Sequence, residues 1–440
     1  MKSVVNPFIY GRALTPSEFL GRESELSRLF GRLSNGQSTA IIGQPHIGKT
    51  SLLNYIKDPP SRTTMFSTRF EQNLFSYLDA HTLHGVKTQT GFWESALAAL
   101  VDYLKAKKLE RFQLLLGAYE LAKKNKFGAF VLEQLFNSLC HGHLRLILML
   151  DEFDDFLSHP VLNSAEFYGS LRSFASRLEG FVLIVAARRD LAQLNQMTQQ
   201  INPHGSPYFN VFTELKLGAL SEKDLTELLN RADDRFNLRD YGYVTAVSGR
   251  HPYLAQVAAA MLWDVIDEGH HIGVVRYQDA TKKLLQQTNH YFADTWNFWT
   301  NETRKAITVV ALAQIQRFLT GDKFLASALI DSLDDYIPEL EALKASGILA
   351  KDKEYGWIVT QNAFLWWLTD ELCRNWRDDT DFKTWLQAQG MDNLLARQEQ
   401  QRMEETAKKV LKAIGKSAST LITAFVQGIA EGVGEGLILK

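Results

Sequence analysis

Short apolar runs alternate with longer segments of helical spacing along the first half of the chain. A run without polar positions, such as Leu146 to Leu150, is typical of a strand that is buried on both faces of a parallel sheet. Between the runs, apolar positions recur every three or four residues, as they do in an amphipathic helix. The pattern predicts an α/β fold, a parallel sheet flanked by helices, with strands at residues 38–42, 74–78, 144–150 and 181–187.

The pattern changes after residue 218. Residues 221–290 show helical periodicity with few strand signals, which predicts a small helical domain. Residues 296–372 hold two or three helices and then a short hairpin of Ile348–Ala350 with Trp357–Thr360, an order that predicts a winged helix. The predicted divisions are an N-terminal segment with a helix, the α/β core, the helical domain, the winged helix and a helical tail, at residues 1–36, 37–218, 219–295, 296–375 and 376–440.

Residues Gly43 to Thr50 fit the phosphate-binding pattern G-x-x-x-x-G-K-[ST] at every fixed position. Glycines at positions 43 and 48 leave room for backbone N–H groups to curl around a phosphate. Lys49 would supply a charge to the β- and γ-phosphates of ATP or ADP, Thr50 a hydroxyl to Mg²⁺, and Ser51 joins this set at the start of the following helix. An ordinary glycine-containing turn is the alternative, but the apolar run before the motif and the helical pattern after it favour a nucleotide site.

A second apolar strand ends in Asp151 and Glu152, about a hundred residues after the phosphate loop. Asp151 is expected to hold Mg²⁺, and Glu152 to orient or deprotonate the attacking water. The alternative is a strand that ends in solvated acids without a function. Asp154 and Asp155 follow, and we expect them to cap the next helix.

Two arginines follow the apolar run at residues 181–187. Ligands bind at the carboxyl ends of strands in open α/β sheets, so a cation at this place can contact the γ-phosphate. We expect one arginine to do so and the other to pair with a carboxylate. Position favours Arg188 over Arg189, and the sequence leaves that choice open.

Composition and net charge limit the partners and the cellular location that we expect for the protein. The 440 residues carry a net charge of −2, so no overall basic field would gather nucleic acid. The two cysteines cannot make a disulfide framework, which indicates reduced thiols and a cytoplasmic protein. The N-terminus lacks the long apolar core of a secretory signal peptide.

Several segments occur in an order that resembles the signal-transduction ATPases with numerous domains (STAND ATPases), and most closely a bacterial and archaeal AAA-like branch of them. The segments are LTPSEFLGRESEL, the phosphate loop followed by SLL, LILMLDEFDDF, VLIVAARRDL, SPYFNVF and SGRHPYLAQ, within about residues 5–372. The resemblance implies a P-loop NTPase sheet with the phosphate-loop strand in the centre. An all-α lid and a winged helix would follow and would clamp ADP at rest and open with ATP.

The resemblance also implies which residues act. Walker A positions are matched by Gly43, Gly48, Lys49 and Thr50, Walker B positions by Asp151 and Glu152, and the sensor arginine by Arg188. Pro252 matches the lid proline that lies against adenine, and the stretch with Gly21 and Arg22 matches the segment that lines the base and ribose. Family members often hydrolyse ATP slowly. The predicted winged helix lacks a Met-His-Asp signature, which leaves open how it would read ADP.

The predicted winged helix is acidic. Between residues 301 and 370, ten carboxylates stand against seven cations, and the helix before the hairpin, DDYIPELEALKASG, carries most of its charge as carboxylate. A helix that enters a DNA groove needs Lys or Arg for phosphate contacts. We therefore expect no DNA binding and interpret this region as structural or regulatory. A winged-helix DNA-associated ATPase of the initiator or transposition-helper type is the alternative function.

The tail at residues 408–440 has lysines followed by a small-residue position every four residues, at Ala424, Gly428, Gly432 and Gly436. Glycine costs about 1 kcal/mol in a solvated helix relative to alanine, whereas G-x-x-x-G suits close approach of two helices. A helix over residues 419–439 would measure roughly 30 Å, the thickness of a bilayer core. One interpretation is membrane insertion or self-assembly. The other is a disordered tail, or an amphipathic helix that packs on its own protein.

Together these features predict a STAND-type ATP switch that hydrolyses ATP slowly and forms homo-oligomers when ATP is bound. A role in bacterial signalling, defence or cell death is expected, with the tail as a membrane or self-assembly effector. The predicted location is the cytoplasm, with membrane association on activation. The trigger and any protein partner cannot be read from the sequence.

Overall fold

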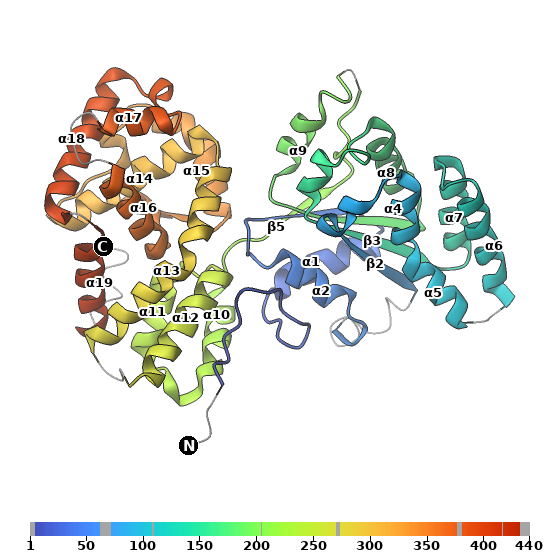
Figure 1. The fold of residues 1–440 in the computed structure, drawn as a ribbon, viewed down its shortest axis with the longest axis horizontal. Coiled ribbons are helices and arrows are strands. Elements are labelled where there is room, and N and C mark those ends of the chain that lie inside the picture. The colour runs from blue at the N-terminus through green and yellow to red at the C-terminus, as the bar shows by residue number, and fades with distance from the viewer. Residues whose placement is uncertain are drawn as a thin grey trace. The chain divides into compact units, whose positions relative to one another are not determined.

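The computed structural model describes residues 5–61, 72–107, 110–203, 205–269, 273–375, 381–415 and 417–431. The chain divides into two compact units (Figure 1). The first, Ala13–Leu217, is called the sheet unit here. The second, called the helical unit, joins Met1–Arg12 to Gly218–Lys440. The chain therefore passes between the units twice, after Arg12 and after Leu217.

The sheet unit is built on five parallel strands in the order β2-β3-β4-β1-β5. The strands are β1 (Thr39–Ile42), β2 (Asn73–Asp79), β3 (Arg145–Asp151), β4 (Phe181–Ala187) and β5 (Thr213–Lys216). The predicted parallel sheet and four of its strands are thereby confirmed. The strand β4 occupies the middle position that the resemblance implied for the phosphate-loop strand, and β1 lies between β4 and β5.

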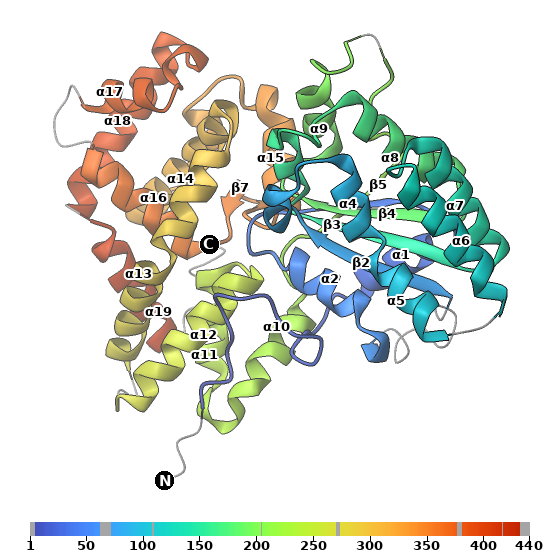
Figure 2. The same ribbon diagram turned by 45° about the vertical axis from the view of Figure 1, so that its right-hand side comes forward.

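Helices cover both faces of the sheet (Figures 1 and 2). The α-helices of this unit are α1 (Glu23–Ser34), α2 (Lys49–Lys57), α4 (Gln89–Ala96), α5 (Ala98–Lys107), α6 (Glu110–Lys124), α7 (Ala129–His141), α8 (Ala165–Arg177) and α9 (Leu191–Thr198). Two 3₁₀ helices, η2 (Ala80–Gly85) and η3 (Phe153–Ser158), follow β2 and β3 directly.

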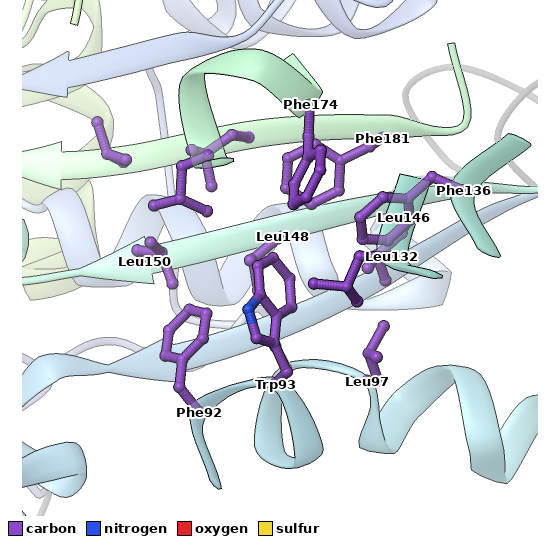
Figure 3. Close-up of a cluster of buried hydrophobic side chains, with 14 of the residues drawn as sticks. Phe92, Trp93, Leu97, Leu132, Phe136, Leu146, Leu148, Leu150, Phe174 and Phe181 are labelled. Atoms are coloured by element: carbon purple, nitrogen blue, oxygen red, sulfur yellow. The ribbon is translucent and has the colours of Figure 1, made fainter. Parts of the chain in front are cut away.

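Alternation along β3 sends its side chains into two separate cores. On one face, Leu146, Leu148 and Leu150 pack with aromatic residues of α4, α7 and α8 (Figure 3). On the other face, Ile147 and Met149 pack with leucines and isoleucines of α1 and α2. Because both faces are covered, residues 146–150 of β3 and all of β4 are apolar, and this explains why the sequence pattern identified them.

The helical unit consists of helices and one small hairpin. Its α-helices are α10 (Glu222–Leu229), α11 (Leu238–Ser248), α12 (Pro252–Asp267), α13 (Val274–Phe298), α14 (Asn301–Thr320), α15 (Ile337–Ala345), α16 (Asn362–Asn375), α17 (Asp381–Ala388), α18 (Arg397–Ile414) and α19 (Ser419–Glu431). The hairpin pairs β6 (Leu349–Asp352) with β7 (Gly356–Val359) in antiparallel fashion. The predicted hairpin is confirmed, while the winged helix itself stays a prediction.

The first described residues form a strap on α12, which we define as residues 5–12. The Asn6 side chain donates to the carbonyl of Ala260 and to the carboxylate of Asp264, at 3.2 and 2.9 Å. The backbone N–H of Ile9 donates to the side chain of Gln256 at 3.0 Å. Phe8 is buried and stacks on Phe236, with ring centroids 5.5 Å apart. The strap therefore belongs to the helical unit, and the chain enters the sheet unit only at Ala13.

The tail helix α19 packs on its own unit, against α11 and α13. Phe425 is buried and meets Trp366 of α16, with ring centroids 5.0 Å apart. The Asp370 carboxylate accepts the N–H of Ala418 at 2.6 Å, just before the helix begins. For residues 419–431 the structure thus shows the packed amphipathic helix, one of the two interpretations of the tail. Gly432 and Gly436 lie outside the described residues.

Among the described residues, no helix combines the length and the apolar composition that a membrane crossing requires. Within α19, the described glycine of the repeat, Gly428, is buried.

Candidate nucleotide site

The phosphate loop connects β1 to α2, and each of its two glycines has a separate geometric reason. A Cβ on Gly43 would lie 2.7 Å from the Ile47 side chain and 3.1 Å from the carbonyl oxygen of Leu217. Gly48 has a φ of +99°, in the left-handed region that side chains disfavour. The close approach at Gly43 and the backbone turn at Gly48 are the features that the motif predicts for a phosphate cradle.

Lys49 begins α2 and is buried, with 4% of its surface exposed. Its ammonium donates to the carbonyl oxygens of Gly43 and Gln44, at 2.9 and 3.0 Å. Burial lowers the pKa of Lys49, and the nearby carboxylates, led by Glu152, oppose that shift. The loop thus holds a buried cation that is directed at the carbonyls of its own loop.

The carboxylates predicted for the second half of the site lie at the end of β3. Asp151 is 1% exposed, and its two oxygens accept from the backbone N–H of Glu152 and from the hydroxyl of Tyr77, each at 3.0 Å. Glu152 has a φ of +47°, which is uncommon for a residue with a side chain. Strained backbone of this kind gathers at functional sites, where the surrounding structure holds it in place.

The two arginines after β4 have different partners. Arg189 donates to Asp154 at 3.2 Å, whereas the Arg188 guanidinium lies 3.6 Å from a carboxylate oxygen of Glu152. Arg188 is 37% exposed and Glu152 is 23% exposed, so a ligand at the sheet edge can compete for this pair. Both arginines thus pair with a carboxylate, and the contact of Arg188 with phosphate stays a prediction.

The expectation that Asp154 caps the next helix is wrong. Its buried carboxylate instead accepts the backbone N–H groups of Arg188 and Arg189, at 2.6 and 3.2 Å. Asp155 pairs with the exposed His81 at 3.0 Å, and Glu152 occupies the cap position of η3 without a side-chain hydrogen bond. Asp154 therefore fixes the end of β4. An acid just after a strand looks the same in the sequence whether it caps a helix or anchors a neighbouring strand.

The segment with Gly21 and Arg22 runs along the phosphate loop and α2. The N–H of Leu14 donates to the hydroxyl of Ser51 at 3.0 Å. At the other end of the segment, the buried Arg22 donates to the carbonyl of Ile47 at 3.4 Å and to Glu25 at 3.2 Å. The segment is therefore fixed at one end to α2, where Ser51 uses its hydroxyl for the attachment, and at the other end to the phosphate loop. The predicted contacts of Gly21, Arg22 and Ser51 with nucleotide stay predictions.

Pro252 begins α12 in the helical unit, at the first helical position, where its missing N–H costs no hydrogen bond. The residue before it, His251, is buried, and its ring nitrogen Nε2 lies 3.2 Å from the hydroxyl of Tyr291. The predicted contact between Pro252 and adenine stays a prediction.

The oxygen ligands predicted for Mg²⁺ fit a hard cation. Mg²⁺ in nucleotide sites is typically held by one or two protein oxygens together with the phosphates, and Thr50 with Asp151 offers a hydroxyl and a carboxylate. Each oxygen of Asp151 accepts one hydrogen bond from a described residue and so keeps a further lone pair. Within the described ranges, no group of three or more His, Cys, Asp or Glu residues forms a complete protein cage for a metal.

Sequence reasoning missed Tyr77 and the role of Asp154. Tyr77 lies on β2, directly opposite Met149 of β3, so its side chain is on the same face as Asp151 two residues further along. The alternation along residues 73–79 shows which face of β2 Tyr77 occupies. It indicates the contact with Asp151 only when β3 is known to be the neighbour of β2.

Comparison with known proteins bears on the family and the fold of the chain. Residues 135–315 match the family described as Novel STAND NTPase 2, which confirms the predicted resemblance. The Walker-type ATPase of Pyrococcus abyssi has a similar fold, with a TM-score of 0.51, 15% identity and coverage of 82% of this chain and 99% of that one. The ORC2 protein of Aeropyrum pernix, solved with ADPNP and ADP, matches with a TM-score of 0.43, 13% identity and coverage of 94% and 97%. Among curated proteins, none matches this sequence significantly.

Proposed function

Because residues 135–315 match the STAND NTPase family and the chain has a P-loop ATPase fold, we propose that the protein is an ATP-dependent switch that hydrolyses ATP slowly. The observation that carries the proposal is the set of charges around the Lys49 ammonium. The buried Lys49 donates to two carbonyls of the loop, and Glu152 and Arg188, which follow the carboxyl ends of β3 and β4, form an ion pair at 3.6 Å. A buried cation among these groups, beside a glycine-lined loop, has the arrangement that phosphoryl transfer needs.

Lys49 is placed to exchange its partners for phosphate. It donates now to two neutral carbonyls of the loop. Phosphate oxygens are charged acceptors, and charge-assisted hydrogen bonds are about twice as strong as neutral ones, so the exchange favours the nucleotide. Thr50 and Asp151 would hold Mg²⁺, which neutralises charge on the β- and γ-phosphates when it is bound.

The ion pair between Glu152 and Arg188 supports slow turnover that depends on ATP. While Arg188 holds the Glu152 carboxylate, that carboxylate is directed away from a role as general base. A γ-phosphate would draw Arg188 to itself and release Glu152 to accept a proton from water. Because ADP lacks the γ-phosphate, the same pair would re-form after hydrolysis.

The strap supports a switch rather than an enzyme that acts on a separate substrate. Residues 13–22 are fixed to the phosphate loop and α2 through Leu14 and Arg22. Residues 5–12, directly before them, are fixed to α12 in the helical unit. A shift of the loop on nucleotide binding would therefore pull on α12 through the chain itself. The proposed output is homo-oligomer formation in bacterial signalling, defence or cell death.

The tail is the proposed effector. In this structure α19 is held by the Phe425 contact with Trp366 and by the Arg239 guanidinium, which donates to the carbonyl of Ala430 at 2.5 Å. In the proposed active state the tail leaves this position and acts in self-assembly or against an anionic membrane, through residues 408–440. The lysines before α19 would suit anionic lipid.

Native mass spectrometry of the purified protein tests the proposal. We expect bound ADP at rest and a larger homo-oligomer after addition of Mg·ATP. Lys49→Ala is the control, because it removes the buried cation and should leave the protein without nucleotide and without the ATP-dependent mass change. A wild-type protein that carries no nucleotide and does not bind added ATP would overturn the proposal.

A further inference from the structure

We propose that Tyr77 is the positioning residue that fixes the Asp151 carboxylate for the divalent cation of the bound nucleotide. The inference rests on the function proposed above and extends its site by one residue that neither the phosphate-loop motif nor the acidic strand end contains. Its basis is the hydrogen bond from the Tyr77 hydroxyl to Oδ2 of Asp151 at 3.0 Å.

The strand register explains how the two side chains meet. Tyr77 lies opposite Met149, and Asp79 lies opposite Asp151, in the parallel pair of β2 and β3. Side chains two residues apart share a face of a strand, so Tyr77 reaches Asp151 along the diagonal. Both residues therefore lie on the face that α1 and α2 cover, the face on which the phosphate-loop helix begins.

The ring of Tyr77 contacts a side chain of α2, the helix that follows the phosphate loop. The ammonium of Lys57, the last residue of α2, lies 4.3 Å from the centre of the Tyr77 ring. A cation in this position is attracted by the face of the ring. The phenol thus bridges the end of α2 and the end of β3, the two elements that carry Thr50 and Asp151.

The two hydrogen bonds to Asp151 constrain it differently. Oδ1 accepts the N–H of Glu152, the adjacent residue, which leaves the plane of the carboxylate able to rotate about that contact. Oδ2 accepts the Tyr77 hydroxyl, which comes from another strand and fixes that rotation. Asp151 is almost completely buried, so water does not readily replace either donor. A carboxylate held at both oxygens presents its remaining lone pairs in one direction, which is what a cation with strict octahedral geometry requires.

A residue that hydrogen-bonds to a metal ligand without touching the metal typically changes the metal affinity by 10–100-fold when it is removed. Tyr77→Phe removes only the hydroxyl and keeps the ring under Lys57. We therefore expect the Mg²⁺ concentration for half-maximal ADP binding to rise about tenfold in Tyr77→Phe. ADP affinity in EDTA, where no cation takes part, should stay within about twofold of wild type.

Tyr168→Phe is the matched control. Tyr168 is a buried tyrosine of the same unit, and within the described residues its hydroxyl has no hydrogen-bond partner. Loss of that hydroxyl should leave both the Mg²⁺ midpoint and the ADP affinity in EDTA unchanged.

Isothermal titration calorimetry with ADP over a series of Mg²⁺ concentrations, on the full chain, gives both quantities. A midpoint in Tyr77→Phe equal to that of wild type would overturn the role of Tyr77 while leaving nucleotide binding intact. An equal loss of ADP affinity with Mg²⁺ and in EDTA would also overturn it, because the residue would then support the fold rather than the cation. Absence of ADP binding by the wild-type protein would overturn the proposed function together with this inference.

Discussion

Replacing Asp154 by alanine tests whether this buried carboxylate organises the nucleotide edge of the sheet. Its oxygens accept three hydrogen bonds, from the N–H groups of Arg188 and Arg189 and from the Arg189 guanidinium. The side chain is 6% exposed, so water has little access to replace it. Asp154→Ala should therefore destabilise the sheet unit and loosen the end of β4, directly before Arg188.

The size of the effect separates this role from that of a helix cap. The variant leaves two part-buried backbone N–H groups without their acceptor, and a donor that loses its partner away from water costs about 1–3 kcal/mol. The expected loss is therefore roughly 2–6 kcal/mol. For a unit of this size, 1 kcal/mol lowers Tm by about 2–4 °C, so a fall of at least about 4 °C is expected. Loss of a helix cap would cost about 1 kcal/mol, a fall of only about 2–4 °C.

Differential scanning calorimetry of the full chain measures the change, with Asp155→Ala as the control. Asp155 is the next residue of the same 3₁₀ helix and pairs with His81 at the surface, where ion pairs contribute about 0–1 kcal/mol. We expect Asp154→Ala to lower Tm markedly and to slow ATP hydrolysis, and Asp155→Ala to do neither. If both variants lower Tm by the same few degrees, Asp154 does not anchor β4 and the reasoning is wrong.

Three further predictions concern the switch. Glu152→Gln should retain ATP binding and lose hydrolysis, because the amide cannot accept the proton from water; unchanged turnover in a phosphate-release assay would exclude Glu152 as the base. A chain stopped after Ser417 should bind ATP like the full chain but release no dye from anionic liposomes; equal release by both would remove the membrane part of the proposal. Phe8→Ala should weaken the strap by about 3–5 kcal/mol, as for other buried aromatic truncations, and leave ATP binding intact while Mg·ATP no longer changes the mass of the protein. An unchanged mass response would show that the strap does not transmit the nucleotide state.

The sequence predicted the strands whose apolar pattern has a single physical cause, burial on both faces of the sheet. Continuous apolar runs identified β3 and β4, because both faces of these strands are covered. The strand β5 escaped prediction, since its sequence TELK contains one buried residue, Leu215, among polar ones. Its strand conformation depends on pairing with β1, a tertiary contact that no local pattern records.

The candidate site shows the same division. Gly43 and Gly48 follow from the local needs of the loop, so a motif finds them. Asp154 and Tyr77 act across strands, on β4 and β3 respectively, and their partners are 34 and 74 residues away in the chain. Spacing along the sequence cannot distinguish an acid that caps its own helix from one that anchors a neighbouring strand. The strand order supplies that information.

Both passages of the chain between the units start beside the elements that carry the phosphate loop, β1 and α2. The first runs from Leu14, whose N–H is bound by Ser51, into the strap on α12. The second begins at Leu217, whose N–H donates to the carbonyl of Ile42 at 2.8 Å and whose carbonyl lies against Gly43. Movement of the loop around a phosphate would therefore shift both connections together. Two connections that move together can turn one unit relative to the other, whereas a single one would act only as a tether, and this favours a conformational output of nucleotide binding.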